Sequence, residues 1–376
     1  MDKYEYLLDH YLDTGYVKVV LPVTRQGAIP RNLNIILRLI RFRLWIIINS
    51  LDIHKFDIEY SYDTLTEVDV VFSFFHDNFA ASPVCCDDVL YERMAIEAHC
   101  KFLLHLNHYV YNTPRGSEFC SKIKKLFFIA ETNLYKHSEF FREQFDWYQR
   151  DVGILPFCVQ DRFSVKSSGP RNPRAVATGA ITFKITENHF VAHFGTNLLQ
   201  PQRKYLLEHG DAVPQLDVAS VESFGSVSKG FMEILLRRIK GQVTLWFRKI
   251  TPKNLRDEEF YSIDLVEYYN SYSFVVCPSE IIGLPGIGAF EAMACGAVLI
   301  DDGNDFYKDY GLVSDTHYAR YDGSAVDLKA KLDCLSEKSE FVEDLRACSL
   351  SVINASMRSD SCLMAFRDNV AKLDEH

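Results

Sequence analysis

The segment from Cys277 to Ile300 constrains the fold of this chain more than any other part of it. Its sequence is CPSEIIGLPGIGAFEAMACGAVLI. The pattern predicts a strand over residues 273–277, a glycine-rich loop, a short helix that carries Glu291, and a second strand over residues 297–300. A glycine-rich loop that leads from a strand into a helix presents backbone N–H groups and the positive end of the helix dipole. The segment therefore predicts a binding site for an anionic ligand.

Size and composition indicate a globular protein with more than one core. The 376 residues are 48% hydrophobic and 24% charged, which is enough for two domains of ordinary size. The formal net charge of −10 argues against a nucleic-acid partner, because such binding needs Lys and Arg to replace counterions. The ten cysteines form no CxxC pair. Buried free thiols are therefore favoured over a disulfide framework or a zinc site.

The first residues do not resemble a signal peptide, and the most apolar run, residues 44–48, is too short to cross a bilayer. We therefore expect a cytoplasmic protein. The stretch between Arg31 and Arg43 is both basic and apolar, and two interpretations stay open. Its bulky residues favour a helix packed on a sheet. Alternatively, it forms a face for peripheral contact with the inner side of an anionic membrane.

Short apolar runs alternate with amphipathic stretches along the whole chain, which is typical of α/β proteins with parallel sheets. The Gly-, Pro- and Ser-containing run at residues 166–173 is the best linker candidate. We predict an N-terminal Rossmann-like domain over residues 1–165 and a C-terminal Rossmann-like domain over residues 174–376. Two placements stay open for the last helix, on the C-terminal domain or returned to the N-terminal one.

The individual elements are predicted from apolar periodicity. The strands are expected at residues 17–23, 68–75, 101–106, 126–130, 152–157, 174–178 and 243–247. The helices are expected at residues 32–49, 89–99, 134–145, 231–240 and 263–272, at a stretch around Arg203 and Lys204, and over most of 325–373.

With this layout, the residues from Glu267 to Ile300 resemble the GT-B glycosyltransferases of the large retaining, family 4-like group. The likeness is strongest in NSYSFVVCPSE and FEAMACGAVLI, and weaker likenesses follow in the right order at DVVFSFFHD, CKFLLHLNHY, KLFFIAETNLYKHSEFF, VGILPFCVQDRF and RAVATGAI. The resemblance implies two Rossmann-like domains that face each other across a cleft. It also implies sugar transfer from a nucleotide-diphosphate sugar to a hydroxyl acceptor.

The resemblance further implies the class of ligand. A UDP-sugar is the favoured donor, and no cofactor is required. The acceptor is a glycan or a lipid-linked glycan, in the synthesis of a cell-surface polysaccharide such as capsule or lipopolysaccharide. No Asp-x-Asp motif stands at the end of a predicted strand, so we expect no required metal.

The donor site is assigned from the resemblance. The residues expected near the donor phosphates are Gly286, Ile287, Gly288 and Ala289, and Glu291 is expected on the ribose. The donor diphosphate needs cations because its charge grows as the glycosidic bond breaks. Arg248 and Lys249 follow a predicted strand and are the first candidates, with Lys184 and Arg203 as further options.

The sequence departs from the family at one position. Members commonly carry a glutamate eight positions before the one matched by Glu291, and this chain has Gly283 there. Glu280, three residues earlier, is the nearest substitute. Besides retaining transfer, an inverting transferase and a non-catalytic nucleotide-binding module stay open. A dinucleotide fingerprint is disfavoured, because Glu291 stands where that motif has its third glycine.

Histidines follow two of the predicted N-terminal strands. His76 stands beside Asp77, and His108 follows the next strand. Loops at the carboxyl ends of parallel strands are where open α/β sheets bind ligands. The resemblance implies that such a histidine contacts the donor sugar. In an inverting enzyme, the His76–Asp77 pair would instead deprotonate the acceptor hydroxyl.

Overall fold

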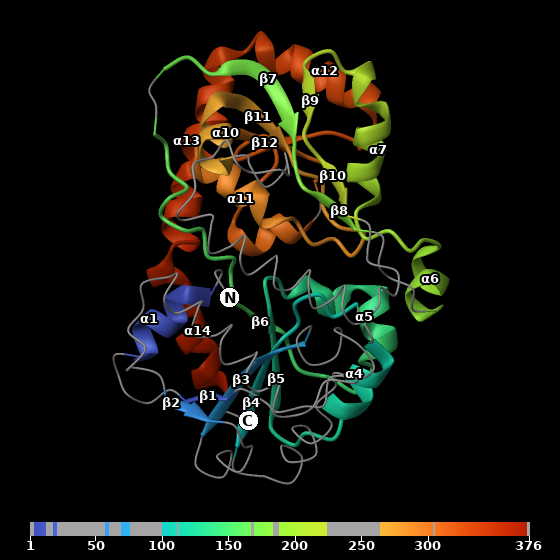
Figure 1. The fold of residues 1–376 in the computed structure, drawn as a ribbon, viewed down its shortest axis with the longest axis vertical. Helices are drawn as coiled ribbons and strands as arrows, with labels where there is room; N and C mark the ends of the chain where they lie inside the picture. Colours follow the sequence, from blue (N-terminus) through green and yellow to red (C-terminus); the bar gives the residue numbers. More distant parts are fainter. Residues whose placement is uncertain are drawn as a thin grey trace, which may run out of the picture.

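The structure is a computed structural model that describes residues 4–12, 18–20, 57–59, 69–75, 100–110, 113–166, 169–182, 188–223, 264–303 and 305–373. Within these residues, two α/β lobes are stacked along the long axis of the molecule (Figure 1). Each lobe is built on a parallel sheet, as the alternating pattern of the sequence predicts.

The N-terminal lobe holds a sheet whose strands follow one another in chain order. The strands are β3 (Val70–Phe74), β4 (Lys101–His105), β5 (Leu126–Ala130) and β6 (Gly153–Ile154), all parallel. Its other elements are α1 (Glu5–Leu12), α4 (Thr113–Cys120), η5 (Leu134–His137), α5 (Glu139–Gln144) and the short parallel pair β1 (Lys18–Val20) and β2 (Asp57–Glu59).

Alternation along β4 and β5 decides which helices cover which face of this sheet, since successive side chains of a strand point to opposite sides. Leu103 and Phe127 pack in one cluster with residues of α1 and of the last helix, α14 (Ser359–Lys372). Leu104 and Phe128 pack with residues of α4 and α5. Both faces of the sheet are therefore buried, as expected for parallel strands.

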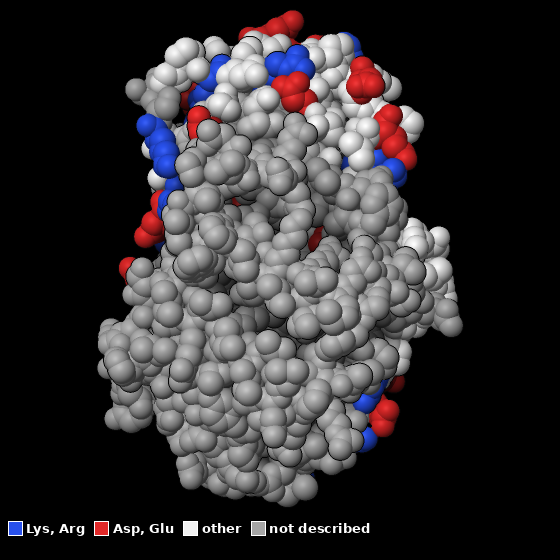
Figure 2. Space-filling model, viewed as in Figure 1, with Lys and Arg blue, Asp and Glu red and all other residues white. Residues whose placement is uncertain are grey.

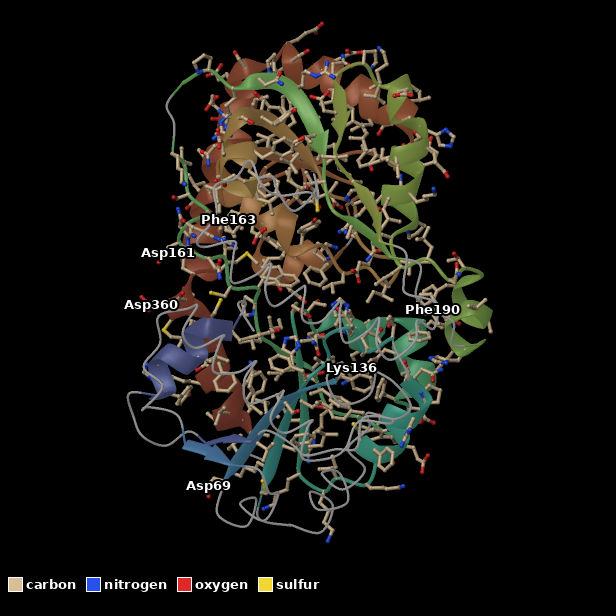
Figure 3. All side chains as sticks on the ribbon, in the orientation of Figure 1. Asp69, Lys136, Asp161, Phe163, Phe190 and Asp360 are labelled. Carbon is tan, nitrogen blue, oxygen red and sulfur yellow. The ribbon has the colours of Figure 1, made fainter. Side chains whose placement is uncertain are left out.

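The last helix lies on the N-terminal sheet although it ends the chain. The rings of Phe72 and Phe366 have centroids 5.2 Å apart, and the Asn369 side-chain amide donates to the Ile154 carbonyl at 2.8 Å. The chain passes between the lobes through residues 155–166, where Asp161 and Phe163 are labelled in Figure 3. The domain boundaries at residues 165 and 174 stay a prediction.

The C-terminal lobe holds a sheet in the order β13-β12-β11-β7-β9, again parallel throughout. The strands are β7 (Asn172–Ala177), β9 (Leu216–Val218), β11 (Tyr272–Val276), β12 (Val298–Asp301) and β13 (Ala319–Arg320), with a separate parallel pair, β8 (Ala180–Thr182) and β10 (Val221–Ser223). The helices are α6 (Asn188–Phe194), α7 (Pro201–His209), η6 (Gly210–Ala212), α10 (Leu265–Ser271), α11 (Ile287–Ala294), η8 (Asp305–Tyr310), α12 (Ala325–Ser336) and α13 (Ser339–Ser356).

In this sheet too, alternating residues of β11 and β12 show which helices cover each face. Val275 and Leu299 pack with α11 residues such as Phe290. Val276 and Ile300, one residue further along each strand, pack with buried residues of α7 and α12. On the side of this lobe in view, Lys and Arg side chains alternate with Asp and Glu, so its described surface there has no patch of one sign (Figure 2).

The two lobes share a continuous hydrophobic cluster. It includes Phe128 of the N-terminal sheet and Phe290 of α11, and the Phe157 and Phe290 ring centroids are 5.5 Å apart. Polar contacts add to it, because the Tyr310 hydroxyl of η8 donates to the Glu131 carbonyl just after β5. The lobes are therefore in direct contact along the carboxyl end of β5.

Two predicted elements differ from the structure for local reasons. The single helix expected over residues 134–145 is divided into η5 and α5, because Ser138 is extended and its hydroxyl accepts from the Phe141 amide at 3.1 Å as the cap of a new helix. The strand expected over residues 152–157 ends after Ile154 as β6. Pro156 has no amide hydrogen to continue a ladder.

Several predicted features lie outside the described residues. They are the helices at 32–49, 89–99 and 231–240, the strand at 243–247, the stretch between Arg31 and Arg43, and the side chains of His76, Asp77, Lys184, Arg248 and Lys249.

Candidate functional site

The segment that dominates the sequence folds as one strand–loop–helix–strand unit. It consists of β11, the loop 277–286, α11 and β12, and β11 pairs directly with β12 in parallel. The helix of this unit is terminated by Gly296, which has a φ of +79°. The Ala297 amide then donates to the Ala292 carbonyl at 3.0 Å, as at other helix ends that are capped by glycine. The two strands, the helix and the turn between α11 and β12 are thus determined by residues close in sequence, as predicted.

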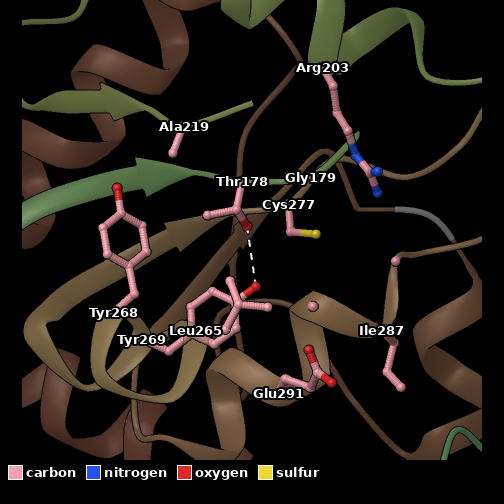
Figure 4. A pocket seen from close by; sticks show the side chains of 12 residues that line it. Thr178, Gly179, Arg203, Ala219, Leu265, Tyr268, Tyr269, Cys277, Ile287 and Glu291 are labelled. Atoms are coloured by element: carbon pink, nitrogen blue, oxygen red, sulfur yellow. Dashed lines mark hydrogen bonds between the residues drawn. The ribbon is translucent and has the colours of Figure 1, made fainter. Parts of the chain in front are cut away.

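A pocket of about 210 Å³ opens where β7 and β11 end and α11 begins. Its lining residues come from six parts of the C-terminal lobe, and they are Thr178, Gly179, Arg203, Ala219, Leu265, Tyr268, Tyr269, Cys277, Gly286, Ile287, Gly288 and Glu291. In Figure 4, Arg203 and Ile287 lie at one end, Tyr268 and Ala219 at the other, and Glu291 between them. This is the carboxyl-end position at which open parallel sheets bind ligands.

Arg203 supplies the positive charge at its end of the pocket. The residue belongs to α7 and is only 7% exposed. Its Nε donates to the Pro278 carbonyl at 3.3 Å and its Nη1 to the Ala180 carbonyl at 3.2 Å. These bonds hold the guanidinium between the turn that follows β7 and the start of α11.

Two glycines leave the space that this guanidinium occupies. A Cβ atom at Gly286 would lie 2.7 Å from Arg203 Nη2, and one at Gly179 would lie 2.9 Å from Nη1. Gly179 also has a φ of +125°, which side-chain-bearing residues rarely adopt. The glycines of the loop and of the turn therefore bring a cation to the N-terminus of α11, where the helix dipole is also positive.

Glu291 and two hydroxyl groups form the middle of the pocket. Thr178 Oγ1 lies 3.4 Å from the Tyr269 hydroxyl, and a Cβ at Gly288 would be 2.9 Å from that same hydroxyl. Burial, followed by the neighbouring Cys277, raises the pKa of Tyr269, and Glu291 raises it further. Tyr269 therefore stays a neutral hydrogen-bonding group at every physiological pH.

The remaining lining is apolar or aromatic. Leu265 and Tyr268 come from α10, and Ala219 follows β9. Leu265 is 37% exposed, and most of the other lining residues are half-buried. From one end to the other, the pocket thus offers a cation with a helix N-terminus, then a carboxylate with hydroxyls, then an apolar wall.

Some of the residues predicted to bind the donor line this pocket. Gly286, Ile287, Gly288 and Glu291 line it. Ala289 is completely buried in the first turn of α11 and is outside the lining. The structure also adds Thr178, Tyr268 and Tyr269, whose only sequence signal was their place at a strand end or in a helix that precedes the glycine-rich loop.

Glu280 and Gly283 lie together in the loop before α11. The Gly283 amide donates to the Glu280 carbonyl at 2.7 Å, and Gly283 has a φ of +82°. The turn therefore favours glycine where the resembled family has glutamate. The Glu280 carboxylate accepts from the Gln200 side chain at 3.0 Å and lies outside the pocket lining.

His108 lies in the turn after β4 and has a φ of +48°, an αL conformation that His adopts more readily than most residues. Among the described residues, no group of His, Cys, Asp and Glu side chains is arranged to hold a metal ion. Within the same part of the chain, no helix is long and apolar enough to cross a membrane.

The chain was compared with known proteins. No family model matches it, and no curated protein matches its sequence. HepE from Anabaena, in a structure with UDP and glucose, matches with a TM-score of 0.53 at 10% identity, over 98% of this chain and 94% of that one. Sucrose-phosphate synthase from Thermosynechococcus elongatus matches with a TM-score of 0.52 at 12% identity, over 98% and 93%.

These likenesses extend over nearly the full length of both chains. The fold is therefore GT-B, with two Rossmann-like lobes, and the fold predicted from the sequence is confirmed. Identities of 10–12% establish the fold and not the activity, because one fold hosts many functions.

Proposed function

We propose that this protein is a glycosyltransferase that moves a sugar from a UDP-sugar to a hydroxyl acceptor. The observation that carries the proposal is the order of groups in the pocket. A cation, a carboxylate and an apolar wall follow one another from Arg203 through Glu291 to Tyr268. That order matches the diphosphate, ribose and base of a nucleotide, in a GT-B fold.

The diphosphate would lie between Arg203 and the first turn of α11. Backbone N–H groups and the helix dipole favour an anion there, and the guanidinium adds a full charge and several donors in a fixed plane. As the bond between sugar and phosphate breaks, negative charge grows on the leaving diphosphate. Groups already fixed at this point stabilise that charge without reorganising.

The ribose would lie against Glu291, whose carboxylate accepts hydrogen bonds from sugar hydroxyls. Tyr268 and Leu265 would then contact the base. The pocket volume of about 210 Å³ is below the ~300–1,000 Å³ of sites that enclose a whole drug-sized ligand. The pocket would therefore enclose only part of the donor, and we expect the transferred sugar to extend toward the N-terminal lobe.

The uridine base is supported by HepE, which was solved with UDP and with UDP-glucose. Further parts of the proposal rest on the sequence. They are a retaining mechanism, an acceptor in capsule or lipopolysaccharide synthesis, and a cytoplasmic location with membrane contact through the stretch from Arg31 to Arg43. Arg248 and Lys249 would bind the diphosphate. In the inverting alternative, the His76–Asp77 pair would act as the base.

The test uses Glu291→Gln with Glu267→Gln as its control. Glu267 is an exposed glutamate of α10 that is outside the pocket lining. We expect Glu291→Gln to weaken UDP binding by about 10-fold, because a charge-assisted hydrogen bond contributes ~1.5–3 kcal/mol. Glu267→Gln should bind UDP as the wild type does, as measured by calorimetry.

Wild-type protein is then incubated with UDP-, GDP- and CMP-sugars, and release of the nucleotide is followed with and without glycan acceptors. Release of nucleotide supports a transferase. Nucleotide binding with no turnover of any donor would favour the non-catalytic module, for which Gly283 in place of glutamate is the motivating observation. If no nucleotide binds, the proposed function is wrong.

A further inference from the structure

Helix α6 lies beside α5 of the N-terminal lobe, although in sequence it stands between β8 and α7 of the C-terminal lobe (Figure 1). Phe190 of α6, labelled in Figure 3, is buried in the same hydrophobic cluster as Phe140 of α5. The helix therefore connects the two lobes at a place apart from the chain crossing at residues 155–166.

One side chain of α5 receives most of this contact. The Phe140 ring is 2% exposed, and four rings of α6 lie at centroid distances of 5.2–5.9 Å from it. Aromatic pairs at such distances stabilise a contact beyond the area that they bury. A polar contact lies beside them, because Glu143 Oε2 of α5 is 3.1 Å from a ring nitrogen of α6. The four rings are those of His189, Phe190, His193 and Phe194, and the nitrogen is Nδ1 of His193.

The next residue of α5 packs inside the N-terminal lobe. Phe141 is 1% exposed, and its ring centroid lies 4.7 Å from that of Phe145 and 6.3 Å from that of Phe128. Phe140 and Phe141 are thus buried to the same degree and contact different parts of the molecule. They form a matched pair for experiments.

The chain leads from α6 directly to the glycine-rich loop. Gly195 turns it with a φ of +68°. The Leu199 carbonyl then accepts from the Ile281 amide at 2.9 Å, and the Gln200 side chain donates to the Glu280 carboxylate at 3.0 Å. The segment 196–200 is therefore bonded to the backbone and to a side chain of the loop 277–286.

The same segment also begins α7, which carries the cation of the pocket. The Lys204 amide donates to the Gln200 carbonyl at 3.2 Å in the first turn of this helix. Arg203 belongs to that turn, and a Cβ at Gly286, where the loop ends, would lie 2.7 Å from its Nη2. The segment 196–200 thus positions both the loop and the guanidinium.

We propose that Phe140 is a positioning residue for the donor site, acting from the N-terminal lobe through α6 and the segment 196–200. The inference rests on the proposed function, because it concerns the end of the pocket assigned to the diphosphate. Phe140 itself is outside the pocket lining. While α6 packs on Phe140, the loop and Arg203 are held where the diphosphate would bind. Donor binding and packing of the lobes at α6 are then linked, and each favours the other.

The first test compares Phe140→Leu with Phe141→Leu. Each change removes a buried ring, so the Tm should fall in both. The Kd for UDP should rise by about 3- to 10-fold in Phe140→Leu, because the groups that bind the diphosphate lose their fixed places. It should stay within about twofold in Phe141→Leu, as measured by calorimetry. Equal weakening in both variants would reflect general destabilisation and would overturn the proposal.

A second pair of variants makes the same comparison on α6 and leaves the N-terminal core unchanged. Phe194→Ala removes a half-buried ring that contacts Phe140. Val191→Ala, at a position that is 37% exposed on the same helix, is its control. We expect Phe194→Ala to raise the Kd for UDP as Phe140→Leu does, and Val191→Ala to leave it within about twofold.

The last measurement needs no nucleotide. Hydrogen exchange of the amides of residues 277–286, followed by mass spectrometry, should be faster by about threefold or more in Phe140→Leu and Phe194→Ala than in their controls. Unchanged exchange in both folded variants overturns the inference, and so does faster exchange with unchanged UDP affinity. If the wild type binds no nucleotide but exchange is still faster in these variants, the link between α6 and the loop is kept while the proposed function fails.

Discussion

The pocket proposed to bind the nucleotide and the segment from Glu131 to Tyr135 differ in how their buried polar groups are hydrogen-bonded. In the pocket, Arg203 donates to two backbone carbonyls, and the Tyr269 hydroxyl lies within 3.4 Å of Thr178. At the lobe boundary, Glu131 Oε2 and the Tyr135 hydroxyl have no partner among the described residues. The polar groups of the pocket are therefore fixed by hydrogen bonds within the protein, whereas the boundary segment has two buried polar atoms without a partner among the described residues.

This difference predicts how substitutions behave. A change in the pocket removes bonds that the folded protein already makes, so it should affect stability and nucleotide binding together. Tyr135→Phe removes a hydroxyl that has no hydrogen-bond partner among the described residues, so it should not lower the stability of the folded protein. Fixed groups also act more strongly on a developing charge, because they need not reorganise.

The largest effect is expected from Arg203→Met. Loss of the cation should weaken UDP binding by about 10- to 100-fold, since a hydrogen bond to a charged group contributes ~1.5–3 kcal/mol and each 1.4 kcal/mol is tenfold. The Tm should also fall, because the Pro278 and Ala180 carbonyls lose their donor. Calorimetry measures the first effect and a thermal melt the second.

Lys204→Met is the control for this change. Lys204 is the adjacent residue and pairs on the surface with Glu208 at 3.0 Å, so its loss should leave UDP affinity within about twofold. If Arg203→Met binds UDP as tightly as Lys204→Met does, the guanidinium does not contact the diphosphate. The comparison between the two regions would then lose its main support.

A smaller effect is expected from Gly288→Ala, through a steric contact. The new Cβ would lie 2.9 Å from the Tyr269 hydroxyl, so the ring or the first turn of α11 must shift. We expect UDP binding to weaken by about 3- to 10-fold, because misplaced hydrogen bonds lose part of their ~1.5–3 kcal/mol.

The double variant Gly288→Ala/Tyr269→Phe should recover part of this loss, because phenylalanine lacks the atom that is contacted. Tyr269→Phe alone is the control. It should weaken UDP binding only by the amount that the contact between the Thr178 and Tyr269 hydroxyls contributes. A double variant that is no better than Gly288→Ala would mean that the loss has another origin.

The smallest effect is expected from Asp217→Asn, on β9 of the same sheet and outside the pocket lining. Arg174 donates to the Asp217 carboxylate at 2.5 Å and 3.1 Å, and this pairing lowers the pKa of Asp217. A lowered folded-state pKa stabilises the protein above the unfolded value of ~3.9, and the stabilisation is lost as the pH falls through the folded value.

Melts between pH 6 and pH 3 check this prediction. At pH 6 the wild type should melt higher than Asp217→Asn by about 1–3 °C, as expected for an exposed pair, and the difference should shrink toward pH 3. UDP affinity should not change. A difference that grows on acidification would contradict the assigned sign.

The sequence predicted the local parts of the site and left its assembly open. The unit from β11 to β12 could be predicted because a strand, a glycine-rich loop and a helix are encoded by neighbouring residues. Arg203 was only an option beside Arg248 and Lys249, because its approach to Gly179 and Gly286 depends on how α7 packs. Likewise, Ser138 divides a predicted helix by capping a new one, which periodicity alone does not reveal.

Apolar periodicity and turn chemistry therefore determined the α/β class, the succession of strands and helices along much of the chain and the glycine-rich start of α11, since these depend on residues a few positions apart. Only the tertiary structure decided which distant side chains meet. Glu131 and Tyr310 are 179 residues apart, and the lobe boundary that joins them forms when two sheets and their helices pack. Contacts of that kind leave no periodic signal in the sequence, because they depend on the packing of whole lobes.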